Sequence, residues 1–354
     1  MSLRLLKYLL FTTLLISIVS NQEFLKSDEV TKNLSVDDKI NVTFIEEKIL
    51  RSHTKGVTCL AELGDNLLAS GSYDSTIKIW TLEDPEKPIT TLLGHTDRIE
   101  TILYMKEGIL ASGSRDGTIR IWDTKNNFNL IKILSDHKKG VTSIIQLSNS
   151  MMLTGSDDFS IKIWDTNNNF KLIRTINAHI LASISCLLEL SNGLIASADK
   201  GYRIYIWELT SDNDLKILYT LEHVSFVSDL VDLRNGMLAS SSYDGSIRIW
   251  DMNNHFSLIK KLLGKLGEVR SMVVVENRFL VSSNTWYPTN PLIIWDTEED
   301  FNQLVNFPST HDGYVESMLQ LKNGLVATGS GDFLIKLWRV DIQQGGKFCL
   351  EQLE

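Results

Sequence analysis

Apolar residues in this chain occur in short runs separated by small polar turns, and the whole pattern repeats. The segment NLLASGSYDSTIKIW, which ends at Trp80, returns as GILASGSRDGTIRIW and again as GMLASSSYDGSIRIW. Each copy has a β-branched run, a turn of glycine, serine and aspartate, and a second run ending in tryptophan. Further short runs precede and follow it, such as 141–144 and 171–176. The pattern predicts four strands of about five residues in each unit and no helical face.

The unit recurs at a nearly constant spacing. Seven of the eight tryptophans follow one another at steps of 42, 42, 43, 43, 45 and 43 residues: Trp80, Trp122, Trp164, Trp207, Trp250, Trp295 and Trp338. A period of about 40–45 residues with four strands is that of a propeller blade, whereas a helical solenoid would show a 3.6-residue apolar repeat. We therefore expect an all-β fold, a seven-bladed β-propeller of four-stranded antiparallel blades over residues 42–354.

Polar residues recur inside the unit as regularly as the tryptophans. In five repeats a histidine stands 27 residues before the tryptophan, and an aspartate follows that histidine by 21 residues. This spacing resembles that of the WD-repeat family. The resemblance covers about residues 42–340 and implies a buried hydrogen-bond network of four side chains in each blade. Carried over by position, these quartets are His53, Ser70, Asp74 and Trp80; His95, Ser112, Asp116 and Trp122; His137, Thr154, Asp158 and Trp164; His223, Ser240, Asp244 and Trp250; and His311, Thr328, Asp332 and Trp338.

Sets of histidine, serine and aspartate also occur in hydrolytic triads. Five copies at constant spacing, each with a tryptophan, favour a scaffold over a single reactive site. The chain has no glycine-rich phosphate loop, HExxH or nucleophile elbow, and its three cysteines show no zinc-site spacing. Cys59 and Cys186 occupy equivalent repeat positions and are interpreted as core residues, while Cys349 is left unassigned. We expect a protein that is not an enzyme and that has neither cofactor nor metal.

Two repeats depart from the pattern. The fourth has one extra residue in its turn, which displaces Asp199 and predicts a partial quartet. In the sixth, Lys265 stands where the other repeats have histidine, the turn aspartate is missing and three residues are inserted. This inserted loop contains Trp286 and Tyr287.

The first and last blades must pair, because an open sheet edge promotes aggregation. The resemblance implies one blade shared between the two ends of the chain. The segment Phe44–Leu50 lies where other repeats place their outer strand, so we expect it to complete the seventh blade. A second segment, Lys347–Leu353, competes for the same place, and we favour the N-terminal strand.

In the WD-repeat family, the turns that carry the aspartates and the loops that carry the histidines share one rim, the usual binding face. Aromatic residues and arginines dominate interface hot spots. Applied to this chain, these rules give a candidate partner-binding rim of Tyr73, Arg115, Tyr243, Arg270, Trp286 and Tyr287. Trp286 has a second interpretation, in which it fills the space left by the missing histidine of its repeat.

The N-terminus predicts a secretory signal peptide over residues 1–20. Arg4 and Lys7 precede an apolar run from Tyr8 to Val19, and Ser20 is a small residue at a cleavage point. A run of about 12 apolar residues suits a signal peptide and is shorter than the roughly 20 that span a bilayer. A polar arm over residues 21–41 follows, with possible glycosylation at Asn33 and Asn41. We therefore expect export and no membrane span in the mature chain; the alternative is a cytoplasmic protein.

The net charge of −9 disfavours nucleic acid and anionic membranes as partners. The resemblance implies a non-catalytic scaffold or adaptor that binds a protein or peptide on one rim. The alternative is a substrate-recognition subunit of a larger enzyme complex such as a ubiquitin ligase, although only about 30 residues lie between the apolar run and the first blade, too few for an F-box domain. A third possibility, an enzyme on a propeller scaffold, has no motif to support it, and the sequence indicates no oligomeric state.

Overall fold

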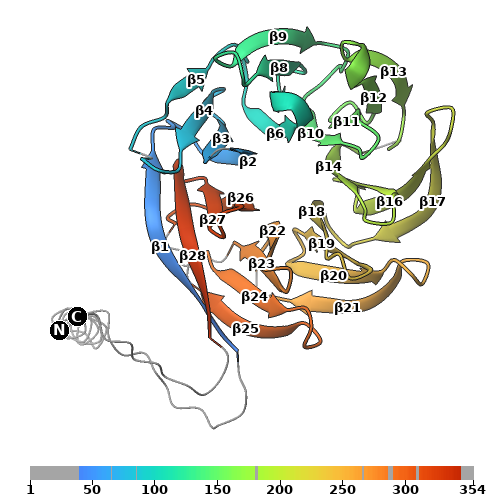
Figure 1. The fold of residues 1–354 in the computed structure, drawn as a ribbon. Helices are drawn as coiled ribbons and strands as arrows, with labels where there is room; N and C mark the ends of the chain where they lie inside the picture. The colour runs from blue at the N-terminus through green and yellow to red at the C-terminus, as the bar shows by residue number, and fades with distance from the viewer. Residues whose placement is uncertain are drawn as a thin grey trace, which may run out of the picture. The chain divides into compact units, whose positions relative to one another are not determined.

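The computed structural model describes residues 40–343, except residues 65, 85, 180–181, 265–266, 286–289 and 308–310. Its strands form seven separate antiparallel sheets of four strands each. The sheets are arranged as blades around a central axis (Figure 1). The predicted seven-bladed propeller is therefore confirmed. We number the blades along the chain and letter their strands A to D from the axis outward.

The first three blades follow one another directly along the chain. Blade 1 consists of β2 (Val57–Gly64), β3 (Leu67–Ser72), β4 (Ile77–Thr81) and β5 (Thr90–Leu92). Blade 2 consists of β6 (Ile99–Met105), β7 (Ile109–Ser114), β8 (Ile119–Asp123) and β9 (Asn129–Leu134), with the 3-10 turn η1 (Lys106–Gly108) after β6. Blade 3 consists of β10 (Val141–Gln146), β11 (Met151–Ser156), β12 (Ile161–Asp165) and β13 (Lys171–Ile176), with the 3-10 turn η2 (Thr166–Asn168) after β12.

The remaining blades continue this order, and the last one also takes up the first strand of the chain. Blade 4 consists of β14 (Ile184–Glu189), β15 (Ile195–Asp199), β16 (Arg203–Leu209) and β17 (Leu215–Glu222). Blade 5 consists of β18 (Val227–Asp232), β19 (Met237–Ser242), β20 (Ser246–Asp251) and β21 (Ser257–Leu263). Blade 6 consists of β22 (Val269–Val275), β23 (Phe279–Asn284), β24 (Leu292–Asp296) and β25 (Asn302–Phe307). Blade 7 consists of β26 (Val315–Gln320), β27 (Val326–Ser330), β28 (Leu334–Gln343) and β1 (Asn41–Arg51).

Burial of the strands decreases from the middle of each blade to its edge. In strand B all residues after the first are buried, as in β11, whereas the residues of the D strand β13 alternate between exposed and partly buried. Strand B is covered by neighbouring blades on both faces, which explains its unbroken apolar run. A Cβ added at Gly155 would lie 2.6 Å from Ile184 Cγ2 of the next blade, so glycine permits this close approach.

The core consists of seven apolar clusters, each between two consecutive blades. In each cluster the repeat tryptophan of one blade packs with two apolar strand-C residues of the blade before it. Between blades 1 and 2, for example, Trp122 lies in one cluster with Ile77 and Ile79. The series includes the junction of blades 7 and 1, where Trp80 packs with Ile335 and Leu337. The core is therefore continuous around the ring.

The ring is closed by the N-terminal strand. β1 pairs antiparallel with β28, from Asn41 opposite Gln343 to Arg51 opposite Leu334. The predicted Phe44–Leu50 strand is confirmed and extends to Asn41–Arg51, so Asn41 belongs to the propeller and not to the predicted arm. The ion pair of Lys336 Nζ with Glu46 Oε2, at 2.8 Å, joins the same two strands.

Several sequence predictions lie outside the described residues. These are the signal peptide over residues 1–20, the acceptor Asn33, the competing strand Lys347–Leu353, and Cys349. Lys265, Trp286 and Tyr287 of the sixth repeat also lie outside them. Within the described part of the chain, no helix has the length and apolar character needed to cross a membrane.

Candidate functional site

Each quartet links a loop between blades to the interior of its own blade. In blade 1, His53 Nε2 lies 2.8 Å from Ser70 Oγ, and His53 Nδ1 lies 2.9 Å from Asp74 Oδ2. Trp80 Nε1 donates to the same Ser70 hydroxyl at 2.8 Å. Because the indole N–H can only donate, Ser70 Oγ accepts from it and can donate to the imidazole. Blades 2, 3 and 7 contain the same three contacts at 2.8–2.9 Å.

The quartets are buried and therefore do not form an open reactive site. Ser70 and Trp80 have no exposed surface, and His53 is 7% exposed. Burial acts to raise the pKa of Asp74, but hydrogen bonds from His53 and Thr76 outweigh it and hold that pKa well below its ordinary value. A triad serine must reach a substrate, whereas these hydroxyls are enclosed and already bonded to tryptophan. The geometry is that of a structural network.

The fourth quartet is complete, so the prediction of a partial network in that blade was wrong. His179 Nδ1 lies 2.7 Å from Asp199 Oδ2, and both His179 Nε2 and Trp207 Nε1 lie 2.8 Å from Ser197 Oγ. Asp199 is the last residue of β15, and the extra residue of the turn is accommodated after it. The carboxylate therefore reaches the same place although its separation from the histidine is 20 residues.

The fifth quartet is incomplete, contrary to the sequence prediction. His223 Nε2 and Trp250 Nε1 bond to Ser240 Oγ, but His223 Nδ1 lies 4.0 Å from Asp244 Oδ2. Neither of these two atoms has a hydrogen-bond partner among the described residues. In blades 1, 2, 3 and 7 the backbone N–H after the histidine also donates to the aspartate, and no such bond holds the loop of blade 5 in place. Burial lowers the pKa of His223 to about 4.

The sixth blade uses a different set of polar residues. Trp295 Nε1 donates to Ser282 Oγ at 3.1 Å, and Ser282 Oγ donates to Asn284 at 3.2 Å. Asn284 thus bonds to the hydroxyl that a histidine contacts in the other blades. Arg278 also forms two hydrogen bonds with Asp296, at 2.9 and 2.8 Å. The sequence signal for this pair was the aspartate that follows Trp295.

The B–C turns and the loops before strand A form one face of the ring, which we call the B–C face. A backbone hydrogen bond joins turn to loop in every blade, as from Tyr73 N to Gly56 O at 2.9 Å and from Arg115 N to Arg98 O at 3.0 Å. The opposite A–B face carries the turns between strands A and B. The described candidate residues Tyr73, Arg115 and Tyr243 lie in B–C turns, and Arg270 is the second residue of strand β22.

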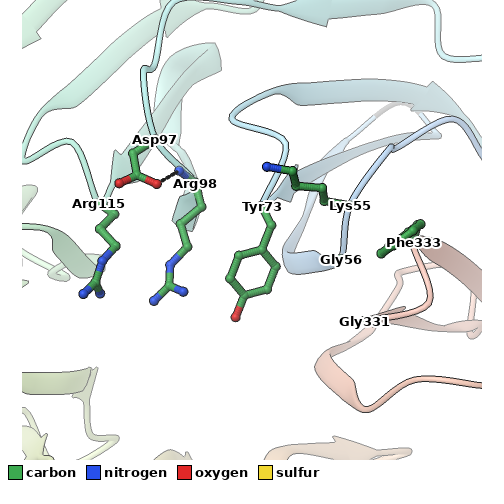
Figure 2. A pocket seen from close by; sticks show the side chains of 8 residues that line it. All are labelled: Lys55, Gly56, Tyr73, Asp97, Arg98, Arg115, Gly331 and Phe333. Atoms are coloured by element: carbon green, nitrogen blue, oxygen red, sulfur yellow. Dashed lines mark hydrogen bonds between the residues drawn. The ribbon is translucent and has the colours of Figure 1, made fainter.

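The B–C face contains a cavity of about 510 Å³ above the junction of blades 7, 1 and 2. In Figure 2 the side chains of Tyr73, Arg98 and Arg115 extend in parallel into the same space. Arg98 also lies over the Tyr73 ring, 4.8 Å from its centroid. The sequence did not single out Arg98, because the residue at this loop position differs from blade to blade, as between Gly56 and Arg98. The cavity is lined by Lys55, Gly56, Tyr73, Asp97, Arg98, Arg115, Gly331 and Phe333.

Five charged side chains, alternately positive and negative, form a network of ion pairs that begins at this cavity. Arg98 Nε lies 2.6 Å from Glu100 Oε1, and Arg115 Nη1 lies 3.7 Å from the same oxygen. Arg115 Nη1 also lies 3.2 Å from Asp157 Oδ2, and Lys200 Nζ lies 3.0 Å from Asp157 Oδ1. Burial raises the pKa of Glu100, although its cationic neighbours oppose this shift. The network therefore connects the turns of blades 2, 3 and 4.

Arg270 is engaged within the protein rather than presented to solvent. Its guanidinium lies over the rings of Tyr243 and Tyr314, 5.3 and 4.7 Å from their centroids. Its Nη1 bonds to both carboxylate oxygens of Glu316, and its Nη2 bonds to Glu268 at 2.8 Å. The structure thus brings Arg270 and Tyr243 together. They do not line the cavity that contains Tyr73 and Arg115, although Arg270 interacts electrostatically with Tyr73.

Polar side chains also join consecutive blades, and the sequence reading missed them. On the B–C side, the hydroxyl of the second strand-A residue donates to a carbonyl of the next blade: Thr58 to Ile99, Thr142 to Ile184, and Ser228 to Val269. On the A–B side, the sixth strand-A residue accepts from a backbone N–H of the preceding blade: Glu62 from Lys322, Gln146 from Lys106, Glu189 from Ser148, Asp232 from Ser191, and Gln320 from Glu276. They could have been recognised from the sequence, because these residues share one repeat position.

The described cysteines and potential metal ligands do not favour a reactive or metal-binding site. Both described cysteines are free thiols, and burial raises the pKa of Cys59 to about 12, which disfavours the reactive thiolate. No three His, Cys, Asp or Glu side chains within the described ranges are grouped as a metal site requires. A second cavity, of about 810 Å³, opens among the inner strands on the A–B face, with lining residues that include Leu188, Leu230 and Val274.

Comparison with known proteins identifies the repeat. The family described as WD domain, G-beta repeat matches residues 45–81, 86–123, 128–165 and 215–251. A segment of 38 residues is 60% identical to the probable E3 ubiquitin ligase complex SCF subunit scon-2 of Neurospora crassa and covers 11% of this chain. The corresponding sconB subunits of Talaromyces marneffei and Arthroderma benhamiae are 55% identical over 40 residues and 59% identical over 44 residues, or 11% and 12% of this chain. The match spans 6% of the length of each of these relatives.

Proposed function

From the premise that the chain belongs to the WD-repeat family of seven-bladed β-propellers, we propose that it is a non-catalytic scaffold that binds a peptide or protein domain on its B–C face. The observation that carries this proposal is the cavity on that face, into which Tyr73, Arg98 and Arg115 extend. Aromatic and arginine side chains of this kind are the usual anchors of protein interfaces.

The rigidity of the ring supports the same function. The quartets hold the loops of the B–C face against the blades, so a partner meets side chains whose backbone is already fixed. Binding to such a surface loses little conformational entropy. The same quartets enclose the serine hydroxyls, and this favours an interaction role over hydrolysis.

Site-directed photo-crosslinking tests the proposed face. A photoreactive phenylalanine analogue in place of Tyr73 is expected to capture a partner in the cells that produce the protein. The matched control places the same analogue at Tyr104, near the A–B end of strand β6. Capture at Tyr104 alone would show that the partner binds the A–B face and not the B–C face. Capture at neither position would contradict a scaffold that acts through these surfaces.

A second candidate function is substrate recognition within a ubiquitin ligase. It is favoured by the printed names of the relatives, which are probable subunits of SCF ligase complexes. Tagged protein purified from its host, with the proteasome inhibited, should then carry ligase components that mass spectrometry identifies. Their absence alongside a partner captured at Tyr73 would favour a scaffold outside such complexes.

We also propose export through the secretory pathway, on the sequence of residues 1–20. The side chain of Asn41 is exposed at the start of β1, as attachment of a glycan requires. Sequencing of the mature N-terminus is expected to begin near Asn21, and enzymatic deglycosylation is expected to lower the mass. An N-terminus at Met1 would support the cytoplasmic alternative.

A further inference from the structure

Three aromatic residues of the B–C turns occupy a backbone position that suits glycine. The left-handed position of the B–C turn is Gly117 in blade 2 and Gly245 in blade 5, with φ of 84° and 80°. In blades 3, 4 and 7 the same conformation is adopted by Phe159, Tyr202 and Phe333, with φ of 72°, 79° and 74°, and in blade 1 by Ser75, with φ of 68°. A bulky side chain with positive φ is strained, so these positions lose stability relative to glycine.

Phe159 is partly buried, with Lys139 Nζ 5.0 Å from its ring centroid, but burial does not compensate for the strain at the other two. Tyr202 is 46% exposed and Phe333 is 45% exposed. The chain offers a direct contrast in the turns after strand C, where Phe170, Phe256 and Phe301 also have positive φ but are buried. Folding explains those three phenylalanines, because their rings pack into the core. It does not explain Tyr202 and Phe333, and strain that persists at the surface points to a role in binding.

Between Tyr202 and Phe333, the cationic side chains are more exposed than the anionic ones. The side chains of Arg98, Arg115 and Lys200 are 28%, 45% and 41% exposed, whereas those of Glu100 and Asp157 are 17% and 11% exposed. Within this network the anions thus lie beneath and the cations above, three against two. Lys55 and Asp97, which line the adjoining cavity, are both exposed and opposite in charge. We call Arg98, Arg115 and Lys200 the cationic arc. A partner meets positive charge here, although the whole chain has a net charge of −9.

The exposed aromatics lie at the two ends of the cationic arc. Phe333 lines the same cavity as Arg98 and Arg115. Tyr202 follows Lys200 in the same turn and is stacked on Phe226, with ring centroids 6.0 Å apart and planes inclined by 21°. Phe226 lies in turn 5.8 Å from the Tyr243 ring. The surface is therefore apolar, then cationic, then apolar from blade 7 to blade 5.

We infer that this surface binds an acidic peptide segment whose carboxylates are flanked on both sides by aromatic or large aliphatic residues. The cationic arc would pair with the carboxylates, and Phe333 and Tyr202 would contact the flanking side chains. This inference rests on the proposed function, because it specifies the partner of the same face.

Synthetic peptides test the inference directly. The probe is a fluorescein-labelled ten-residue peptide with a core of two aspartates and two glutamates between tryptophans, compared with an Asn/Gln core and with alanine flanks. Fluorescence anisotropy should show that the acidic core binds about ten-fold more tightly than the amide core. Arg115→Gln with Lys200→Gln should abolish this preference. The matched control, Lys106→Glu with Lys322→Glu in A–B turns, should retain it.

A second pair of variants tests the role of the strained aromatics. Tyr202→Gly and Phe333→Gly are expected to raise the midpoint of thermal unfolding and to weaken binding of the tryptophan-flanked peptide. The inference is overturned if the amide core binds as well as the acidic core, if the neutralised variant keeps the preference, or if the glycine variants keep the affinity. If an oligothymidine of equal length binds more tightly than the acidic peptide, the surface binds nucleic acid and the inference is wrong.

The two proposals fail in distinguishable ways. If Tyr73 captures a partner in cells while the peptides show no preference for acid, only the inferred chemistry is wrong. If no partner is captured at Tyr73, the proposed function of the face fails, whatever the peptides do.

Discussion

At the scale of single residues, identical side chains do not ensure identical bonds. Blades 1 and 5 both contain histidine, serine, aspartate and tryptophan at the same spacing. In blade 1 the carboxylate of Asp74 accepts from His53, Thr54 N and Thr76, whereas in blade 5 Asp244 bonds within its own turn and not to His223. A loop shifted by about 1 Å is enough to lose a hydrogen bond.

This difference predicts unequal effects of the same substitution. Asp74→Asn should lower the free energy of unfolding by about 2–3 kcal/mol, because it removes a charged acceptor of several hydrogen bonds. Asp244→Asn should cost about 1 kcal/mol or less, since the bond to the histidine is already missing. Urea titration of both variants measures the two values, and equal losses would contradict the structural difference between the blades.

At the scale of elements, strand A carries the side chains that join neighbouring blades. Its third residue accepts a hydrogen bond from the backbone of the next blade: Ser143 from Leu187, Asp229 from Met272, and Ser271 from Met318. Asp229 does with a carboxylate what two other blades do with a hydroxyl. Removal of this carboxyl from water raises its pKa to about 6.

The raised pKa of Asp229 predicts a pH-dependent loss of stability. A carboxyl whose pKa is higher in the folded than in the unfolded state contributes fully below about pH 4 and loses its contribution as pH rises through about 6. Asp229→Ser should therefore stabilise the protein at pH 7 by about 1–3 kcal/mol relative to its effect at pH 4. Unfolding free energies of both proteins between pH 4 and 7 test this. A difference that does not change with pH would show that Asp229 does not titrate in this range.

The features that could be predicted from sequence are those that recur as a local pattern in each repeat. The tryptophan period and the turn aspartates follow from strands that meet the same environment in each blade, and Phe44–Leu50 was recognised because it has the spacing of an outer strand. The network of Arg98, Arg115 and Asp157 depends on contacts between blades, so no local pattern reports it. The gap at His223 depends on the path of one loop, and its sequence shows no signal for this.

At the scale of the whole molecule, the ring is joined at a seam between the N-terminal strand β1 and the C-terminal strand β28. Val42 and Phe44 of β1 are buried against blades 6 and 7. The Phe44 ring lies 5.9 Å from Phe307 and 6.5 Å from Trp338. β1 therefore joins the outer strand of blade 6 as well as completing blade 7.

Phe44→Ala is expected to weaken this seam strongly. Loss of a buried phenylalanine destabilises by about 3–5 kcal/mol. The matched control is Ile45→Ala, one residue further along the same strand, which is exposed and should cost less than about 1 kcal/mol. The midpoint of thermal unfolding and the rate of proteolysis within β28 measure the effect of each substitution. Similar losses in the two variants would show that β1 does not seal the ring through its inner face.

The seam also sets the order in which the ring is made during translation. Glu46 and Lys336, which meet across it, are 290 residues apart in the chain. At roughly 5–20 residues per second, a ribosome takes on the order of 15–60 s between them. Among the described strands, β1 is thus the first to be synthesised and the last to gain its neighbour. Its apolar residues must be shielded from other nascent chains until the seventh blade emerges.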